Sequence, residues 1–447
     1  MKIHSYSIPY DISVAEAPAA SHPGQFIPAA FNGRDIVLLN PFCSGNGDRV
    51  LADKISFILA KEGCRVSILS FDCIQETFCP FPARKGYQDL AVLHNPLFLV
   101  SPVSIMPPQI MNQLIKSIAD QYEFPTEDIA LIDEMDSNVA LLQTPTHYVN
   151  SLRDIGFRQV RFYRLGFSDA AIGYLPLDNA AINDIKQRCR HELELLFDSL
   201  NLTLDRSSHY FIGYISSETP VTAMQTFVVN TLFEHAQDEA DMNYILVVRE
   251  LDNCMGRLPA AMENVLLEPA DDNFNYNTYF GRVKMMLCVP DENRLSPLIT
   301  VQGSGKKNIN IVFCPMLPNN LFHDFIALSR SGIMSGDQSL SEFLSLKGEV
   351  PYYDMQTWKT PLVKALIKQA RRTGRPELEN YMRTKYIGMI CSTNEIYFKL
   401  NQGPPDQFAS AQFKAANARF NHKISSMLAT DYIRALARPA GAGPSSL

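Results

Sequence analysis

The chain has 447 residues, which suits two domains of roughly 200 residues each. Hydrophobic residues make up 46% of it and charged residues 19%, which are ordinary values for a folded globular protein and exclude wholesale disorder. The formal net charge of −7 gives no basic footprint for nucleic acid, and the sequence has no apolar run of transmembrane length. We therefore expect neither a nucleic-acid partner nor a transmembrane segment.

The nine cysteines are odd in number and scattered, which predicts free thiols in a reducing compartment. No Cys-x-x-Cys pair and no histidine pair at i, i+4 spacing occurs, so the sequence does not predict a dedicated zinc site. The first residues lack the apolar core of a signal peptide. We expect a cytoplasmic protein, either in the cell that makes it or, for a delivered effector, in a host cell.

The first half of the chain alternates short apolar runs with amphipathic segments. After a leader rich in proline and alanine at 1–30, strands are predicted at 35–40, 65–70, 97–100, 129–132 and 159–163, and a helical pattern follows each of them except the strand at 65–70. Alternating buried strands and helices predict a parallel sheet that is covered on both faces. Residues 31–200 are therefore expected to form one Rossmann-like domain.

The second half repeats this alternation after a polar stretch at 201–208. A strand at 209–215, a helix at 220–234 and a strand at 244–248 begin a second Rossmann-like domain at 205–385. Helices within 386–437 are expected to pack back on the first domain, and the tail at 438–447 is expected to be disordered. The predicted fold class is α/β, with two Rossmann-like domains facing a central cleft.

A glycine loop at 44–48 joins the first strand to the first helix, at the sheet edge where open α/β folds bind ligands. It is only a truncated GxGxxG, because a dinucleotide fingerprint needs Gly or Ala where Val50 stands. In a nicotinamide interpretation Asp72, at the end of the second strand, would pair with a ribose. The alternative is a tight turn that needs small residues.

A second turn, Gly336-Asp337-Gln338-Ser339, connects a short apolar strand to a helix. The first N–H groups of a helix lack intrahelical acceptors and its dipole is positive there, so such a turn favours a phosphate. One turn later, the carboxylate of Glu342 is placed to accept from two ribose hydroxyls. The alternative is that Asp337 and Ser339 merely cap the helix.

The order of elements over 298–370 resembles the nucleotide-sugar half of GT-B glycosyltransferases. The peptidoglycan N-acetylglucosaminyltransferase has a similar Ser-Glu helix beside the donor's diphosphate and ribose, and the protein-arginine rhamnosyltransferases have a Gly-Glu-Asp-Ser turn at this place. The resemblance implies that 336–339 bind the donor diphosphate and that Glu342 binds the ribose. It makes 31–200 the acceptor domain and 205–385 the nucleotide-sugar domain.

Asn46-Gly47-Asp48 resembles the Asn-aromatic-Gly-Asp loop of the protein-arginine rhamnosyltransferases. The resemblance implies that Asp48 is the general base, which takes a proton from the acceptor as it attacks the anomeric carbon. An earlier aspartate of that family has no counterpart here, because Cys43 and Ser44 occupy the approach.

Three further groups have a functional and a structural interpretation. Asp354 and Gln356 would contact sugar hydroxyls beside Trp358, or they would belong to a capped helix start with a buried tryptophan. Lys306 and Lys307, in a Gly-Ser-Gly-Lys-Lys turn, would touch phosphate or form a solvated turn. Asp133, Glu134 and Asp136 would hold a divalent ion or form a solvated strand end.

The resemblance implies a metal-independent glycosyltransferase that uses a nucleoside-diphosphate sugar as co-substrate and needs no other cofactor. We expect inversion, although retention stays open. The alternatives are a GT-B-fold sugar-nucleotide epimerase and a non-catalytic nucleotide-sugar-binding module. The acceptor remains open among a glycan, a lipid, a small molecule and a protein.

Overall fold

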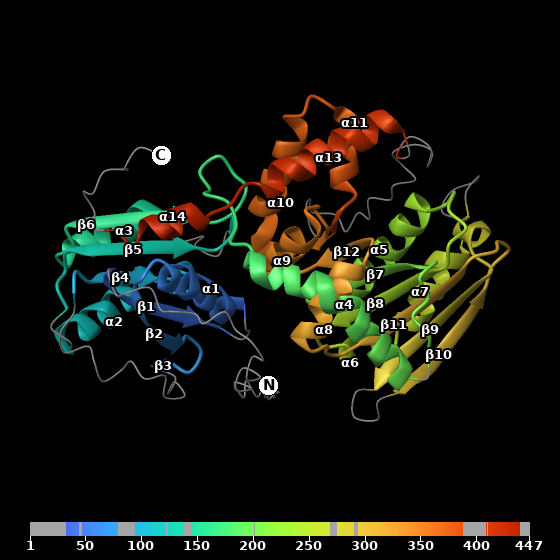
Figure 1. Cartoon of the computed structure of the whole chain (residues 1–447), viewed down its shortest axis with the longest axis horizontal. Helices are drawn as coiled ribbons and strands as arrows, with labels where there is room; N and C mark the ends of the chain where they lie inside the picture. The colour runs from blue at the N-terminus through green and yellow to red at the C-terminus, as the bar shows by residue number, and fades with distance from the viewer. Residues whose placement is uncertain are drawn as a thin grey trace.

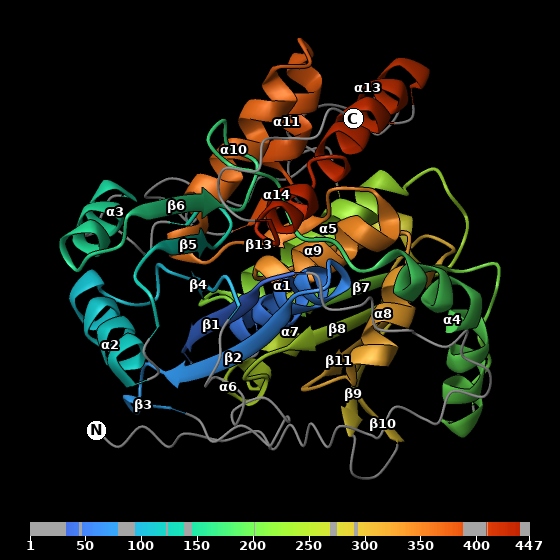
Figure 2. The same ribbon diagram turned by 60° about the vertical axis from the view of Figure 1, so that its left-hand side comes forward.

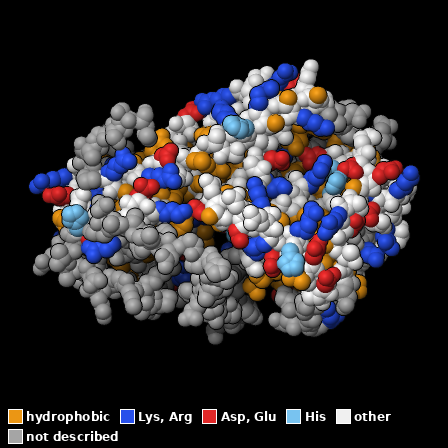
Figure 3. All heavy atoms as spheres, viewed as in Figure 1, with side chains coloured by type: hydrophobic (Ala, Val, Ile, Leu, Met, Phe, Trp, Pro, Cys, Tyr) orange, Lys and Arg blue, Asp and Glu red, His pale blue; other side chains and the backbone are white. Residues whose placement is uncertain are grey.

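The computed structural model describes residues 33–43, 47–78, 94–121, 124–137, 145–200, 202–268, 275–289, 294–387, 408 and 410–438. The described residues form two α/β halves that lie side by side (Figure 1), each built on one sheet. None of the described helices is long and apolar enough to cross a membrane. Basic and acidic side chains are interspersed on the face seen in Figure 3.

The N-terminal half contains a six-stranded sheet in the order β3-β2-β1-β4-β5-β6. Its strands are β1 (Asp35–Phe42), β2 (Arg65–Asp72), β3 (Thr77–Phe78), β4 (Leu97–Val100), β5 (Asp128–Asp133) and β6 (Gln159–Arg164), and its helices are α1 (Gly47–Lys61), α2 (Pro108–Gln121) and α3 (Pro145–Asp154). All pairings are parallel except that of β3 with β2.

Helices cover both faces of this sheet, which is why β1 is a continuous apolar run. Every residue of β1 is buried. Ile36 and Leu38 belong to the same core as Ile55 of α1, whereas Val37 and Leu39 belong to a second core on the α2 side. The alternation of side chains along a strand sends successive residues to opposite faces, and both faces are apolar here.

The C-terminal half contains an eight-stranded sheet in the order β10-β9-β11-β8-β7-β12-β13-β14. Its strands are β7 (His209–Ile215), β8 (Met242–Val248), β9 (Arg282–Val289), β10 (Arg294–Gln302), β11 (Asn308–Cys314), β12 (Ser331–Met334), β13 (Tyr352–Asp354) and β14 (Tyr386–Ile387). Only β10 runs antiparallel to its neighbour.

The remaining helices belong to the C-terminal half, except α4, which connects the two halves, and α14, which returns to the N-terminal half. They are α4 (Asn179–Ser199), α5 (Pro220–Glu234), α6 (Asp252–Met255), α7 (Leu258–Leu267), α8 (Asn319–Leu328), α9 (Asp337–Lys347), α10 (Thr360–Arg371), α11 (Pro376–Arg383), α13 (Ala411–Ser425) and α14 (Thr430–Ala435), with 3₁₀ turns η1 (Tyr276–Tyr279) and η3 (Thr357–Lys359). The connecting helix α4 packs against α8, as Figure 2 shows from a second side.

The last two described helices contact different halves. Helix α13 packs against α11 in the C-terminal half, whereas α14 packs against α1 in the N-terminal half. Arg434 of α14 lies 3.3 Å from Glu62, just after α1. Between these helices, the N–H of Ala429 donates to the carbonyl of Tyr174, so the end of the described chain is bonded to the N-terminal half.

Each sheet has one point where the strand order reverses, between β1 and β4 in the first and between β7 and β12 in the second. Ligands of open α/β sheets bind outside the carboxyl ends of the strands at such a switch point. Helix α1 follows β1 and helix α9 follows β12, so the starts of both helices lie at a switch point. The predicted fold class, two Rossmann-like α/β domains of the GT-B type, is confirmed.

Candidate active site

The starts of α1 and α9 face each other across the boundary between the halves. A Cβ placed on Gly47, at the start of α1, would lie 3.9 Å from Cγ of Gln338 in the first turn of α9. Two turns further along α1, Nζ of Lys54 donates to Oε1 of Gln338 at 2.9 Å. The carboxyl edges of the two sheets therefore meet at the starts of α1 and α9. Ser44, Gly45 and Asn46 lie outside the described residues.

Asp48 lies in the first turn of α1 and is fixed from two sides. Its carboxylate accepts from the N–H of Cys43 at 3.4 Å. Its backbone carbonyl accepts from Nδ2 of Asn40, a buried side chain that also donates to the carbonyl of Ser101 at 2.8 Å. Asn40 thus joins the end of β1, the end of β4 and the start of α1, which holds Asp48 at the switch point.

The environment of Asp48 favours its protonated form. Burial is the largest cause and the negative charge of Glu134 the next, and together they raise the pKa of Asp48 to about 8, although the N–H of Cys43 opposes the shift. Asp337, at the start of α9, also contributes to the raised pKa of Asp48. The carboxyl group therefore carries a proton at pH 7 and becomes a base slightly above it.

The start of α9 is shaped by Gly336. This residue has a φ of +89°, in the region that favours glycine, and it occupies the N-cap position. Among the described residues, no atom lies within 4 Å of a Cβ placed there, so open space lies beside the turn. Neither Asp337 nor Ser339 is the N-cap, and the hydroxyl of Ser339 donates to the carbonyl of Ser335 at 2.7 Å.

The carboxylate of Asp337 points across the boundary between the halves. Its Oδ2 accepts from the N–H of Met135 at 2.9 Å and from Nζ of Lys359 at 2.8 Å. Burial raises the pKa of Asp337 to about 6, and the charge of Lys359 opposes the shift. The side chain of Asp337 is therefore an interdomain contact, and only the backbone of this residue is left to bind a phosphate.

Glu342 also lies at the boundary. Its carboxylate is 3.1 Å from Nε2 of His323 and 4.0 Å from Nζ of Lys54. Burial alone would raise the pKa of Glu342, but the hydrogen bond from His323 and the charge of Lys54 lower it overall. The carboxylate is therefore ionised at pH 7, and its remaining lone pairs can accept from hydroxyl groups.

The two predicted sugar contacts have different surroundings. Asp354 is fully buried at the end of β13, and its Oδ2 accepts from the N–H groups of Ser216 and Ser217, after β7. Gln356 is half-buried and its carbonyl accepts from the N–H of Lys359. Trp358 is 37% exposed, so the interpretation as a buried tryptophan is wrong.

The acidic residues at the end of β5 and just after it do not converge on one point. Asp133 lies 3.6 Å from Arg164, Glu134 bonds to Lys359, and Oδ2 of Asp136 accepts from the N–H groups of Phe167 and Ser168. The one group of metal-ligating side chains among the described residues is His209, His235 and Asp238, which excludes these three acids. Neither the divalent-ion interpretation nor the solvated strand end fits them.

The Gly-Ser-Gly-Lys-Lys turn lies at the opposite edge of its sheet. Because β10 is antiparallel, it returns the chain to the amino end of β11, and the turn lies there rather than beside α9. Lys307 is buried and donates to the carbonyl of His235 at 2.6 Å. The expectation that this turn lies beside the diphosphate helix is therefore wrong. The solvated turn fits Lys306, whose side chain is 88% exposed, but not Lys307.

Asp72, the ribose ligand of the nicotinamide interpretation, forms hydrogen bonds within its own turn. Its Oδ1 accepts from the N–H groups of Ile74 and Gln75 in the turn that follows β2.

Four residues of this site were not identified from the sequence. Asn40, Lys54, His323 and Lys359 each contact a segment far away in the chain, so no local pattern marks them. Only Asn40 has a signal in the sequence that could have identified it, because it is an isolated polar residue within an apolar strand.

The comparisons with known proteins give only distant similarity. No family model matches the sequence, and no curated protein matches it. Solved structures that are similar in shape include EarP, described for arginine glycosylation of translation elongation factor EF-P, with a TM-score of 0.40, 12% identity, and coverage of 90% of this chain and 97% of that chain.

Two further structures show the same level of similarity. An α,α-trehalose-phosphate synthase (UDP-forming) from Burkholderia vietnamiensis has a TM-score of 0.42 and 11% identity, and covers 90% of this chain and 96% of its own. An E. coli structure, trehalose-6-phosphate bound with UDP-2-fluoro glucose, has a TM-score of 0.43 and 7% identity, and covers 90% and 97%. Such values assign no reaction to this chain.

Proposed function

We propose that this protein is a glycosyltransferase that transfers a sugar from a nucleoside-diphosphate donor to an acceptor, with inversion and without a metal ion at the donor site. One observation carries the proposal. Asp48, at the switch point of the first sheet, and the start of α9, at that of the second, lie together at one boundary.

The start of α9 offers the donor a phosphate site. Its first N–H groups have no intrahelical acceptor, and the open space beside Gly336 lets a phosphate approach the backbone. Lys54 bonds to Gln338 in the same turn, so a cation from the N-terminal half lies close to the diphosphate. Glu342, ionised and at the same boundary, is the proposed ligand of the ribose hydroxyls.

Asp48 supplies the base from the opposite half. An acceptor oxygen or nitrogen attacks the anomeric carbon while Asp48 takes its proton, and the bond from that carbon to the diphosphate oxygen breaks in the same step. The negative charge that leaves with the diphosphate is stabilised by the α9 N–H groups and by Lys54. A single displacement of this kind inverts the configuration of the anomeric carbon.

A sugar-nucleotide epimerase is the second candidate. It requires acids from both halves and a histidine at the same site, and this boundary holds Asp48 and Glu134 from one half with Glu342 and His323 from the other. An epimerase would interconvert free donors without releasing a nucleoside diphosphate.

The experiment incubates the purified full chain with a panel of nucleoside-diphosphate sugars and measures released nucleoside diphosphate, with and without EDTA. A glycosyltransferase releases the nucleotide from one donor class by slow hydrolysis, and EDTA does not change the rate at a temperature at which the chain stays folded. Isomerised donor without nucleotide release would show an epimerase. Binding without either product would show a non-catalytic module.

A further inference from the structure

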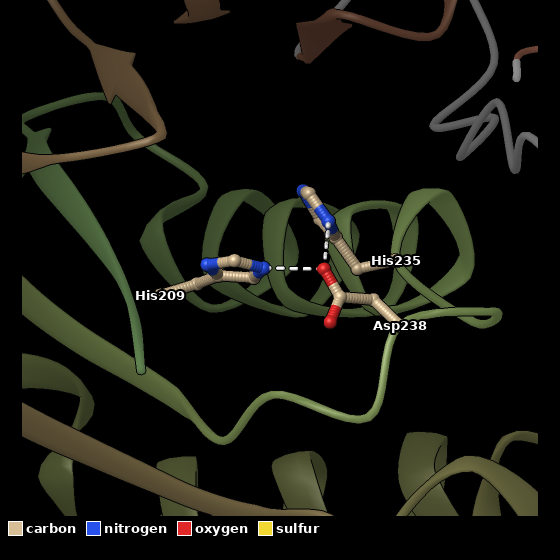
Figure 4. A group of neighbouring side chains, drawn as sticks. All are labelled: His209, His235 and Asp238. Carbon is tan, nitrogen blue, oxygen red and sulfur yellow. Dashed lines mark hydrogen bonds and ion pairs between the residues drawn. The ribbon is translucent and has the colours of Figure 1, made fainter. Parts of the chain in front are cut away.

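Two histidines and an aspartate converge at the edge of the second sheet that lies away from α9. His209 begins β7, His235 follows α5, and Asp238 lies in the turn after it. Figure 4 shows both imidazoles directed toward the carboxylate of Asp238. One ligand atom from each residue lies within 4.8 Å of the other two.

The spacing is close to that of a metal site. Nδ1 of His235 is 3.8 Å from Oδ2 of Asp238, and Nε2 of His209 is hydrogen-bonded to the same oxygen. Zinc bonds of 2.0–2.2 Å in a tetrahedral site place ligand atoms roughly 3.3 Å apart. Side-chain rotations that move these ligand atoms by about 1 Å would therefore bring all three to bonding distance of one zinc ion.

Surrounding contacts hold the three ligands in place. Oδ1 of Asp238, which is not the shared oxygen, accepts from the N–H of Ala240 at 2.9 Å. The backbone carbonyl of His235 accepts from the buried Lys307 at 2.6 Å, and the N–H of His209 donates to the carbonyl of Asp241 at 2.8 Å. The Ala240 bond orients the ligating carboxylate, as second interactions do in metal sites, and the other two contacts fix the backbones of the two histidines.

The cluster also has room beside it. His235 and Asp238 line a cavity of about 570 Å³, whose other walls include Arg330, Tyr381 and Phe413. A cavity of this size accommodates water or a small ligand as the additional ligand that three protein side chains leave open. The seven residues of β7, at about 3.3 Å each, place this site roughly 20 Å from the carboxyl edge of the sheet.

We propose that His209, His235 and Asp238 bind a divalent transition-metal ion of the zinc type. Two neutral imidazoles and one carboxylate form a ligand set that suits zinc, and the cavity supplies the remaining position. The site ties the start of β7 to the end of α5, so the ion stabilises the C-terminal half. Because it lies at the opposite edge of the sheet, it takes no part in binding the donor diphosphate.

The test titrates the metal-free full chain with Zn²⁺ and with Co²⁺. We expect one ion per chain, a Co²⁺ absorption spectrum of a nitrogen and oxygen site without thiolate charge-transfer bands, and a rise in melting temperature on adding zinc. His209→Gln and Asp238→Asn should each weaken zinc binding by roughly a hundredfold or more. The exposed His191→Gln on α4 is the matched control and should bind zinc as the wild type does.

Three results would overturn this site. They are no stoichiometric zinc binding by the wild type at millimolar concentration, thiolate bands that assign the ion to cysteines, and unchanged affinity in both variants with a native circular dichroism spectrum. If a variant does not fold, the wild-type Co²⁺ spectrum and the His235→Gln variant still decide the question.

Discussion

Lys359, just before α10 in the C-terminal half, donates to Oε2 of Glu134, just after β5 in the N-terminal half, at 2.7 Å. The same ammonium group bonds to Asp337 at the start of α9, and its side chain is only 3% exposed. The two carboxylates keep the pKa of Lys359 raised although burial alone would lower it. One buried cation thus joins the proposed donor helix to the half that carries Asp48.

Replacing this cation should separate the two halves. Lys359→Met leaves Glu134 and Asp337 as uncompensated buried charges, and breaking a buried ion pair in this way costs about 3–5 kcal/mol of the free energy of unfolding. Urea denaturation measures the loss, and small-angle scattering measures the separation of the halves. Lys364→Met, on an exposed position of α10, is the control. Equal stability of both variants would show that the ion triad of Lys359, Glu134 and Asp337 does not stabilise the contact between the halves.

Asp48 should make the protein less stable as the pH rises. Its pKa is about 8 in the folded chain and near 4 in the unfolded one, so between these values the folded state binds the extra proton. The contribution of Asp48 to the free energy of unfolding is therefore largest below pH 4 and decreases as the pH rises from 4 to 8. Asp48→Asn should be more stable than the wild type at pH 8, with a smaller difference at pH 5. An identical difference at both pH values would contradict the raised pKa.

The same pKa should appear in the kinetics. If Asp48 is the base, it works only after it loses its proton, so kcat/KM of the wild type should rise with pH to a plateau above about 8. Asp53→Asn, at an exposed position of the same helix, should keep this profile. A rate that is flat between pH 6 and 9 would mean that Asp48 is not the base.

The sequence predicted the parts of the fold that local patterns determine. The apolar run at β1 and the Gly-Asp-Gln-Ser segment that begins α9 each mark a short segment whose conformation follows from its own residues. The hairpin of β9 with β10 was not identified, because β9 alternates exposed and buried residues only over its first four positions and β10 has a single buried residue. Helices α6 and α7 were not identified either.

The sequence predicted only those residues of the candidate site that belong to a motif within one short segment of the chain. Gly336 and Asp48 belong to such motifs. The ion triad of Lys359, by contrast, depends on how the halves pack, and sequence alone does not show which lysine becomes buried beside Glu134. The pairing of Glu342 with His323 likewise joins two helices, α8 and α9, through tertiary contact.

Lys54 and Glu342 should control nucleotide affinity. Lys54→Met removes the cation beside the α9 turn, and Glu342→Gln removes the charged acceptor for the ribose, so each should weaken nucleoside-diphosphate binding by about tenfold, the equivalent of a charged hydrogen bond of 1.4 kcal/mol or more. Isothermal titration calorimetry measures the affinity. Lys61→Met, on α1 but bonded to Asp178, should bind as the wild type does. Unchanged affinity in both test variants, with the fold intact, would move the donor away from α9.

The most direct test of the account compares turnover and donor binding in Asp48→Asn. This change keeps the shape of the side chain and removes the proton acceptor, so release of nucleoside diphosphate should fall roughly a hundredfold or more while donor affinity stays within about twofold of the wild type. Turnover that persists in Asp48→Asn, with donor binding unchanged, would contradict the assignment of Asp48 as the base at this boundary.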